Sequence, residues 1–458
     1  MTPSVLRYSD QIPQMSPQMD FNYTVCIPSN GATFSPNQEV RIPINVPADS
    51  FVDMKRAYIK YRVNNTTAAN AANVAILDPV IGGVSVIDSL RVVSGTGQLL
   101  EETQHYSLLA AIMRINTNAD VRQSRNAIME MSSQAPMTAT SQSLIAGSAA
   151  AGALGRNVIA GGAYATICHE PVSSVFNADK LFPFGFTQGT SYISLTLNSQ
   201  TGGISCFNDA AGGAVVGFGN ITWTTSNWEL HIPVLRPGAE FANNFRTLIQ
   251  SGLPINIHSV GFQNSQQNIA AGSTGENTIT FSTRKRSVKS VLTALRMNSQ
   301  LTNQRCDSSS ALKNNACNQY SYSIGGRRIP SAPINVSGEL AAIDTGSLYA
   351  NTLMALGHYD SNLRGTSSNV ETAATKYYQI IADDLANSSK SVLALDLESY
   401  GEGLSGMNLA GQGLPLVLHA NFLAAGAFAA NAGLADLFVV HDVIFTLDGV
   451  SGTLSASS

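Results

Sequence analysis

The most regular pattern along the chain is an alternation of apolar and polar residues with a period of two. From Arg56 to Val63, apolar side chains at odd positions alternate with mostly charged side chains at even positions. Later segments repeat this alternation, namely 193–197, 228–234, 393–398, 414–418 and 439–447. Because successive side chains of a β-strand point to opposite faces of a sheet, each segment is predicted to be a strand with one buried face.

Three other segments have the pattern of short helices. Tyr106–Ile115 follows the acidic pair Glu101–Glu102, which is predicted to cap the helix because a helix N-terminus favours negative charge. Ala239–Gln250 places four apolar residues on one narrow face, namely Phe241, Phe245, Leu248 and Ile249. Gly338–Leu356 is the third, with apolar positions at Tyr349, Leu353 and Leu356. Since strands dominate and helices fall between them, we predict an all-β sandwich fold with inserted helices.

The chain repeats itself weakly, which indicates two consecutive β modules. A strand-like segment around Trp228 closes the first half, and a similar segment at 438–447 closes the chain. Near the start of each half lies another pair of similar segments, 52–63 and 283–295. Modules of roughly 200 residues have the size of one elaborated sandwich. We predict an N-terminal segment, a first module, a helical linker and a second module, at 1–20, 21–236, 237–251 and 252–458.

Two long stretches of low charge interrupt the strand pattern. The first is Ala135–Ala165, which is rich in alanine and glycine, and the second is Asn298–Tyr320, which is rich in asparagine, glutamine and serine. Both are longer than ordinary connections between strands. We predict that both are surface excursions from a rigid β scaffold, where contacts with partners would lie.

The composition narrows the class of protein further. Only 12% of the 458 residues are charged, whereas 44% are apolar and the net charge is −4. A coiled coil would contain far more Glu, Lys and Arg, and a disordered chain would contain fewer apolar residues. Proteins that coat nucleic acid usually carry a basic surplus, because phosphate contacts dominate their affinity. We therefore predict a large globular chain that does not bind nucleic acid sequence-specifically.

The cysteines and the N-terminus indicate the cellular compartment of the protein. The five cysteines are scattered and form no CxxC pair, so we predict reduced thiols in a reducing compartment; they are Cys26, Cys168, Cys206, Cys306 and Cys317. No basic segment followed by an apolar stretch opens the chain, so no signal peptide is expected. The uncharged run Asn408–Ala435 contains Pro415, His419 and several glycines, and we predict a strand and a loop there rather than membrane contact.

Candidate chemical sites are sparse. A glycine fingerprint at Gly401–Gly406 follows a strand but precedes Pro415 and another strand, so we predict a turn rather than a dinucleotide site. The histidines show no HxH or HExxH spacing: His105, His169, His231, His258, His358, His419 and His441. Cys168 and His169 are adjacent and would point to opposite faces of a strand, which is poor geometry for one metal ion. We predict no metal site and no cofactor.

Acid pairs are the remaining catalytic candidates. Glu101–Glu102 and Asp383–Asp384 are each adjacent in sequence, so their side chains point apart, and we prefer helix capping for the first pair. A Ser/His/Asp triad stays open, because its members need not be close in sequence, but no residue is singled out for one. We therefore predict that the protein is not an enzyme and name no catalytic residue.

The sharpest charge feature is basic. Arg284, Lys285 and Arg286 are consecutive, and Lys289 follows. This cluster has two interpretations: contact with a packaged genome or an acidic neighbouring subunit, or a solvated strand edge that lysine and arginine protect from unwanted pairing. We favour the strand edge. The pair Arg327–Arg328 has the same two interpretations, and the turn at Gly325–Gly326 would project it outward.

The order of these segments resembles the double jelly-roll major capsid proteins of virophages, polinton-like viruses and related tailless icosahedral DNA viruses. The resemblance covers nearly the whole chain and rests on the order of its segments. These are a strand at 51–63, a glycine-flanked segment at 82–102, a helix with Tyr106 at 106–115 and a Gly-Gly-Arg-Arg segment at 322–334. A helix with Tyr349 at 338–356 and two closing strands at 395–398 and 438–447 follow. No single motif is specific, since these proteins share topology more than sequence.

The resemblance implies two consecutive eight-stranded antiparallel jelly rolls. It also implies homotrimers with a pseudo-hexagonal outline that tile an icosahedral virion shell assembled inside the host cell. The partners would then be other copies of the chain, together with penton and minor capsid proteins. Two alternatives remain: a secreted or cell-surface β-sandwich lectin or adhesin, which would explain the surface rich in Asn, Ser and Thr, and a β-rich hydrolase, which no clustered catalytic set supports.

Overall fold

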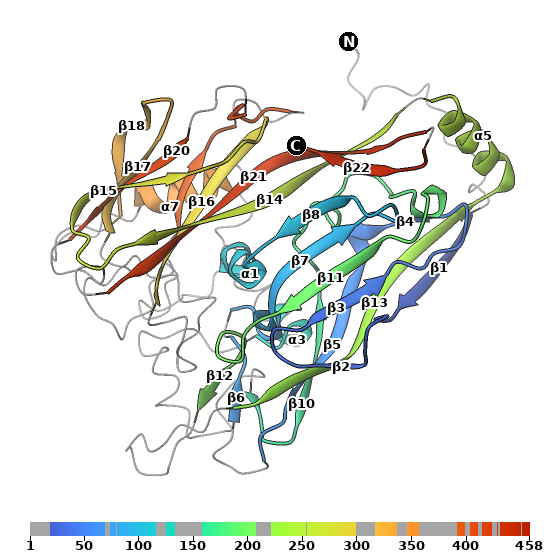
Figure 1. The fold of residues 1–458 in the computed structure, drawn as a ribbon, viewed down its shortest axis with the longest axis horizontal. Coiled ribbons are helices and arrows are strands. Elements are labelled where there is room, and N and C mark those ends of the chain that lie inside the picture. Colours follow the sequence, from blue (N-terminus) through green and yellow to red (C-terminus); the bar gives the residue numbers. More distant parts are fainter. Residues whose placement is uncertain are drawn as a thin grey trace, which may run out of the picture.

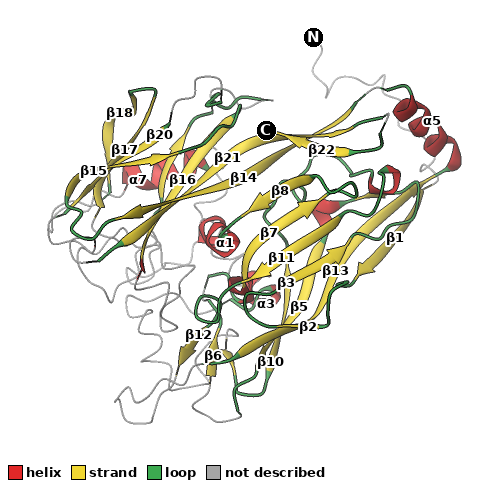
Figure 2. Ribbon diagram, viewed as in Figure 1, coloured by secondary structure: helices red, strands yellow, loops and turns green. Residues whose placement is uncertain are grey.

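The chain forms two β modules, each built from two antiparallel sheets (Figure 1). This is a computed structural model, and it describes residues 19–68, 74–78, 80–115, 125–132, 158–207, 221–252, 254–298, 317–336, 346–356, 392–398, 404–410, 415–423, 428, 431–449 and 451–458. Strands dominate and the helices are short (Figure 2). The prediction of an all-β fold with helices in the connections is confirmed.

The first module pairs two sheets of four main strands. One sheet has the order β1-β13-β5-β10, and the other has the order β3-β11-β7-β8. Their bounds are Met19–Cys26 (β1), Glu39–Pro43 (β3), Tyr58–Asn65 (β5), Ile87–Val93 (β7), Leu99–Thr103 (β8), Tyr164–His169 (β10), Tyr192–Leu197 (β11) and Trp223–Pro237 (β13). Short strands add to this frame: β2 (Thr33–Phe34) and β4 (Phe51–Val52) pair with β13, and a small sheet contains β6 (Val74–Ile76), β9 (Val158–Ile159) and β12 (Ser205–Phe207).

The second module repeats the same frame. Its sheets have the orders β14-β21-β16-β19 and β15-β20-β17-β18. The bounds are Ile255–Ile269 (β14), Gly275–Phe281 (β15), Val288–Met297 (β16), Cys317–Ile324 (β17), Arg327–Asn335 (β18), Leu393–Asp396 (β19), Leu416–Phe422 (β20) and Gly433–Leu447 (β21). A short strand, β22 (Leu454–Ser457), pairs with β21 at the end of the chain.

The two modules have the same topology. If the eight main strands of each module are counted along the chain, one sheet has the order 1-8-3-6 and the other has the order 2-7-4-5, in both modules. This is the strand order of a jelly roll. The internal repeat that the sequence indicates is confirmed, because β13 and β21 are both eighth strands and β5 and β16 are both third strands.

Strand alternation is confirmed where one face of a sheet meets solvent. In β5, Ile59, Tyr61 and Val63 are fully buried while the intervening residues are only partly buried. The buried Tyr61 ring stacks on Trp228 of β13, with ring centroids 4.0 Å apart, and its hydroxyl donates to the Gly83 carbonyl. These side chains fill the space between the two sheets of the first module.

Alternation fails in β16 and β19 of the sheet β14-β21-β16-β19, because both faces of these strands are covered. In β16, nine of ten residues are buried. Ala394 of β19, predicted to face solvent, is fully buried, so that prediction is wrong. Leu393 and Leu395 belong to the second module's core, whereas Ala394 belongs to the cluster that also contains the first module's core. One face of this sheet therefore packs on the core of the second module, and the other face packs on the first module.

The loop after β10, residues 170–191, makes much of this contact between modules. The Phe182 ring meets Phe445 of β21 edge-on, with centroids 5.2 Å apart. The Ser259 hydroxyl of β14 donates to the Ser174 carbonyl at 2.5 Å, and the Gln188 amide donates to the Gly452 carbonyl at 2.9 Å. Apolar packing and hydrogen bonds thus hold the two modules in one arrangement.

The predicted helices are found, with corrections. The helix α1 (Tyr106–Ile115) and the helix α5 (Ala239–Gln250) have the predicted bounds, and α5 connects β13 to β14. On the predicted apolar face of α5, Ile249 is buried but Phe241 and Leu248 are about half exposed, because no part of the described chain covers them. The third helix, α7, spans Gly346–Ala355; residues 338–345 of its predicted range lie outside the described residues.

The two predicted surface excursions lie mostly outside the described residues. Where they are described, each ends in a strand: Tyr164 and Ala165 open β10, and residues 317–320 open β17. The prediction of a surface excursion is wrong for these residues, because Ala165, Cys317 and Tyr320 are buried between sheets. Within the described chain, no helix is long and apolar enough to cross a membrane, and residues 416–422 of the uncharged run form β20.

The contact between Phe182 and Phe445 provides a test of how the modules depend on each other. Phe445→Ala leaves a cavity between the modules and is expected to lower the free energy of unfolding by about 3–5 kcal/mol. Leu404→Ala, at an exposed site, is the matched control and is expected to change it by less than about 0.5 kcal/mol. Chemical denaturation followed by fluorescence measures both, and equal losses would contradict the interpretation.

Candidate interaction surface

An apolar edge strand is the most unusual exposed feature of the molecule. In β1, the side chains on the outward face are all apolar and 45–65% exposed, together with the residue that follows the strand: Met19, Phe21, Tyr23, Val25 and Ile27. Cys26, on the opposite face, is buried in the core. β1 pairs only with β13, so its other edge has no backbone partner in the described chain.

The sequence produces this row by the same alternation that marks the other strands. Asp20 and Asn22 alternate with the apolar residues and are exposed as well. The row was missed in the sequence, because a period-two pattern does not say which face is covered. An exposed, long, apolar edge strand would pair with another chain unless something covers it.

The apolar row extends onto the neighbouring strand. In the register of β1 and β13, Phe21 lies opposite Leu235 and Tyr23 lies opposite Pro233. Farther across the sheet the surface becomes polar: the Tyr58 ring stacks on His231 at 4.6 Å, and Lys60 pairs with Glu229 at 2.9 Å. The surface therefore combines an apolar edge with a polar interior, as many protein interfaces combine apolar and polar zones.

A shallow apolar groove continues this surface toward α5. It has a volume of about 240 Å³, and its lining includes Met19 of β1, Leu235 and Pro237 of β13, and Phe241 and Phe245 of α5. The Phe245 ring packs on Phe51 and Phe186 with centroids 4.9 and 4.8 Å away. The exposed side of α5 and the row on β1 thus form one apolar surface, which we call the β1–α5 surface.

The acid pair Glu101–Glu102 does not cap a helix, so that prediction is wrong. Both residues lie in β8, and α1 begins three residues after this strand ends. Glu101 is buried and accepts hydrogen bonds from the Ser173 hydroxyl and from the Ser174 and Val175 amides. Burial raises its pKa, although these hydrogen bonds oppose the shift. Glu102 points the other way and pairs with Arg91 at 2.7 Å.

Cys168 and His169 point to opposite faces, as predicted, and His169 belongs to a buried polar network. His169 Nε2 lies 2.6 Å from the Tyr106 hydroxyl, and His169 Nδ1 lies 3.0 Å from Glu130. Glu130 also pairs with Arg114 at 2.6 Å. Burial would raise the pKa of Glu130, but contacts with His169 and Arg114 outweigh it and hold that pKa below its usual range. The network fastens the segment after α1 to β10.

The basic cluster does not lie on a strand edge, so our preferred interpretation is wrong. β16, which contains Lys289, lies between β21 and β19 inside its sheet. Lys289 pairs with Glu398 at 2.7 Å and with Asp442 at 3.7 Å. Arg284 and Arg286 are exposed in the loop before β16, whereas Lys285 is half-buried between the modules. Contact with a genome or a neighbouring subunit is untested.

The second basic pair is exposed, as predicted. Arg327 and Arg328 open the edge strand β18, directly after the turn at Gly325–Gly326, where both glycines have positive φ. Arg328 forms an ion pair with Glu276 of β15, across the outer face of the sheet. This face is polar, unlike the β1–α5 surface.

Other predicted positions form no described chemical centre. Residues Gly401–Gly403, Asp383–Asp384, His358 and Cys306 lie outside the described residues. At the end of the glycine fingerprint, the Gly406 amide donates to the Ser287 hydroxyl, and no described helix follows it. In the described part of the chain, no three His, Cys, Asp or Glu side chains converge as metal ligands, and Cys26, Cys168 and Cys317 carry free thiols.

His441 supports a prediction for pH. Burial, and then the nearby charge of Lys285, lower its pKa from 6.5 to about 4. Between these values the unfolded chain binds a proton that the folded chain does not, so stability falls as pH decreases from about 6.5 toward 4. We expect this residue to contribute a loss of roughly 2–3 kcal/mol over that window.

The variant His441→Gln isolates this effect from the titration of carboxylates. It removes the titrating group and leaves an amide that can still donate to the Asp442 carbonyl, the partner of His441 Nδ1. Denaturation curves at several pH values should show a shallower pH dependence of unfolding free energy for the variant than for the wild type. Parallel curves for the two proteins would contradict the assignment.

Comparison with known proteins finds the fold but no close relative. No protein-family model and no curated protein matches the sequence. Among solved structures, the PBCV-1 VP54 crystal structure fitted into a reconstruction of the virophage Sputnik is similar at TM-score 0.59 and 10% identity, over 98% of both chains. The cryo-EM structure of the Sputnik virophage gives 0.58 and 12%, over 100% of this chain and 92% of that one. The Faustovirus major capsid protein gives 0.57 and 11%, over 95% and 92%.

These matches confirm the fold that the resemblance implies. They span nearly the whole of both chains in each comparison, so they include both modules. The chain therefore has the double jelly-roll fold, with identities low enough that the likeness concerns the fold alone.

Proposed function

We propose that this protein is a major capsid protein that self-assembles as pseudo-hexameric homotrimers and tiles an icosahedral virion shell. The β1–α5 surface is the observation that carries the proposal. An apolar edge strand of eight residues needs a partner to avoid uncontrolled pairing, and a symmetric assembly supplies the same partner to every copy. The double jelly-roll fold agrees with this function, since the similar chains named above come from viral capsids.

The two modules have the same strand topology, which supports an assembly in which modules from several copies form a ring. In the second module, the outer face of the 1-8-3-6 sheet is covered by the first module. In the first module, the corresponding sheet has no cover within the described chain, and its first strand is the apolar β1. Contact with the next copy would cover it, and three copies in a closed head-to-tail ring would present six similar modules.

The low charge of the chain suits such packing. Long-range repulsion between like-charged copies would oppose closure of a shell, and only 12% of the residues are charged. In this proposal the protein is a non-enzymatic component of the virion, assembled inside the host cell, and its partners are other trimers together with penton and minor capsid proteins. We also propose the module boundaries 21–236 and 252–458, with 237–251 as the linker.

The oligomeric state in solution tests the proposal. Size-exclusion chromatography with light scattering should give three times the chain mass of 48.3 kDa. Phe21→Lys combined with Val25→Lys places two charges on the outward face of β1 and should weaken assembly at least about 100-fold, because burying unpaired charges is costly. Leu404→Lys, at an exposed apolar site on the second module, should leave the trimer intact.

Electron microscopy adds a second observation. Negatively stained particles of the wild type should show hexagonal outlines, and the double variant should lose them while keeping its far-ultraviolet circular dichroism. A wild-type protein that stays monomeric at all concentrations and binds glycans would contradict the capsid proposal and favour the lectin or adhesin.

A further inference from the structure

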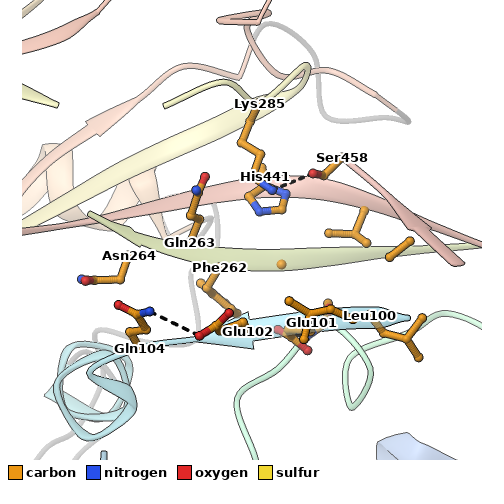
Figure 3. A pocket seen from close by; sticks show the side chains of 15 residues that line it. Leu100, Glu101, Glu102, Gln104, Phe262, Gln263, Asn264, Lys285, His441 and Ser458 are labelled. Carbon is orange, nitrogen blue, oxygen red and sulfur yellow. Dashed lines mark hydrogen bonds between the residues drawn. The ribbon is translucent and has the colours of Figure 1, made fainter. Parts of the chain in front are cut away.

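A polar pocket lies between the two modules and has no function in the proposed assembly. Its volume is about 360 Å³, which is within the range of small-molecule sites. One wall is β8 of the first module, and the other is formed by β14, β21, β22 and the loop that contains Lys285. Figure 3 shows Lys285 beside the His441 ring, Gln263 on β14, and Glu101 and Glu102 on β8 opposite.

Lys285 is a half-buried cation that pairs with no Asp or Glu of the described chain. Its ammonium group donates to the Ser458 hydroxyl at 2.6 Å, and in the described chain no carboxylate lies within ion-pair distance of it. By contrast, Lys60 and Lys289 each pair with a glutamate. Burial lowers the pKa of Lys285, and no Asp or Glu of the described chain offsets this cost. A bound anion would supply the missing charge.

The other polar groups of the same wall can accept hydrogen bonds. His441 is 4% exposed and its Nδ1 lies 3.2 Å from the Asp442 carbonyl, so Nδ1 carries the proton and Nε2 is an acceptor. The side-chain oxygen of Gln263 is buried and has no hydrogen-bond partner in the described chain. Leaving a buried acceptor unpaired is costly. This wall therefore offers one strong donor and two acceptors.

The carboxylates on the opposite wall are already satisfied. Glu101 accepts hydrogen bonds from the Ser173 hydroxyl and from two backbone amides. Glu102 accepts from Arg91 at 2.7 and 3.0 Å and from Gln104 at 3.2 Å. Neither carboxylate forms an ion pair with Lys285.

We propose that this pocket binds a phosphate group, either as hydrogen phosphate or as a phosphate monoester with hydroxyl groups. The phosphate oxygens would accept from the Lys285 ammonium, and a hydroxyl of the ligand would donate to His441 Nε2 or to the Gln263 side-chain oxygen. The ligand would touch both modules and stabilise their arrangement. This site does not depend on the capsid proposal, since the pocket lies within one chain.

Isothermal titration calorimetry tests the site on the full chain, with ionic strength held constant by sodium chloride. Inorganic phosphate and glycerol 3-phosphate are titrated near neutral pH, and tighter binding of one identifies the form of ligand. Lys285→Met should weaken binding of both roughly 10- to 100-fold, because it removes a charge-assisted hydrogen bond. The variant removes a half-buried unpaired charge, so the fold should persist. Lys55→Met, at an exposed lysine, is the matched control and should bind as the wild type does.

Sulfate separates the two parts of the proposal. It carries the charge of phosphate but no hydroxyl, so it should bind the wild type about tenfold more weakly than phosphate if His441 and Gln263 accept a hydrogen bond. Equal binding of sulfate and phosphate would overturn the role of these acceptors. Absence of phosphate binding to the wild type, or equal binding by Lys285→Met and Lys55→Met, would overturn the site.

Discussion

The strands β16 and β19 and the middle of β21 are buried on both faces, and the arrangement of the two modules depends on this constraint. One face closes the core of the second module, and the other joins the cluster that contains the core of the first. A sheet with two apolar faces cannot stand alone in water, because removing apolar surface from water is the main driving force of folding. The second module therefore needs the first, and the loop after β10 supplies Phe182 and several hydrogen bonds to the contact.

The same constraint explains the exposed apolar row on β1. Both modules repeat one jelly-roll topology, yet within the described chain only the second has its 1-8-3-6 sheet covered. The corresponding sheet of the first module keeps apolar side chains on its first strand, where a monomer would have charged residues or proline to block pairing. A feature that is a liability in a monomer becomes an interface in an assembly. The proposed trimer follows from this asymmetry between two otherwise similar modules.

The polar groups show where inference from sequence failed. Glu101 looks like a helix cap in sequence, but it is the buried acceptor that fixes the loop after β10, because it lies within β8 and α1 begins only at Tyr106. The basic cluster looks like a strand edge, but Lys285 lies at the junction of the modules, and Lys289 lies inside a sheet and pairs with Asp442. In both cases the deciding partner is distant in sequence: Ser173 and Ser174 for the first, and Ser458 and Asp442 for the second.

The sequence by itself determined the all-β class, the strands with one wet face, the helices α1 and α5, and the repetition of two modules. These features follow from local periodicity and from end signals within about a dozen residues. Only the tertiary structure decided that β16 and Ala394 are covered on both sides, that β1 is exposed, and that Lys285 and His441 share a pocket with β8. These outcomes depend on which surfaces meet after folding. A period of two marks two faces of a strand but carries no information about what covers each of them.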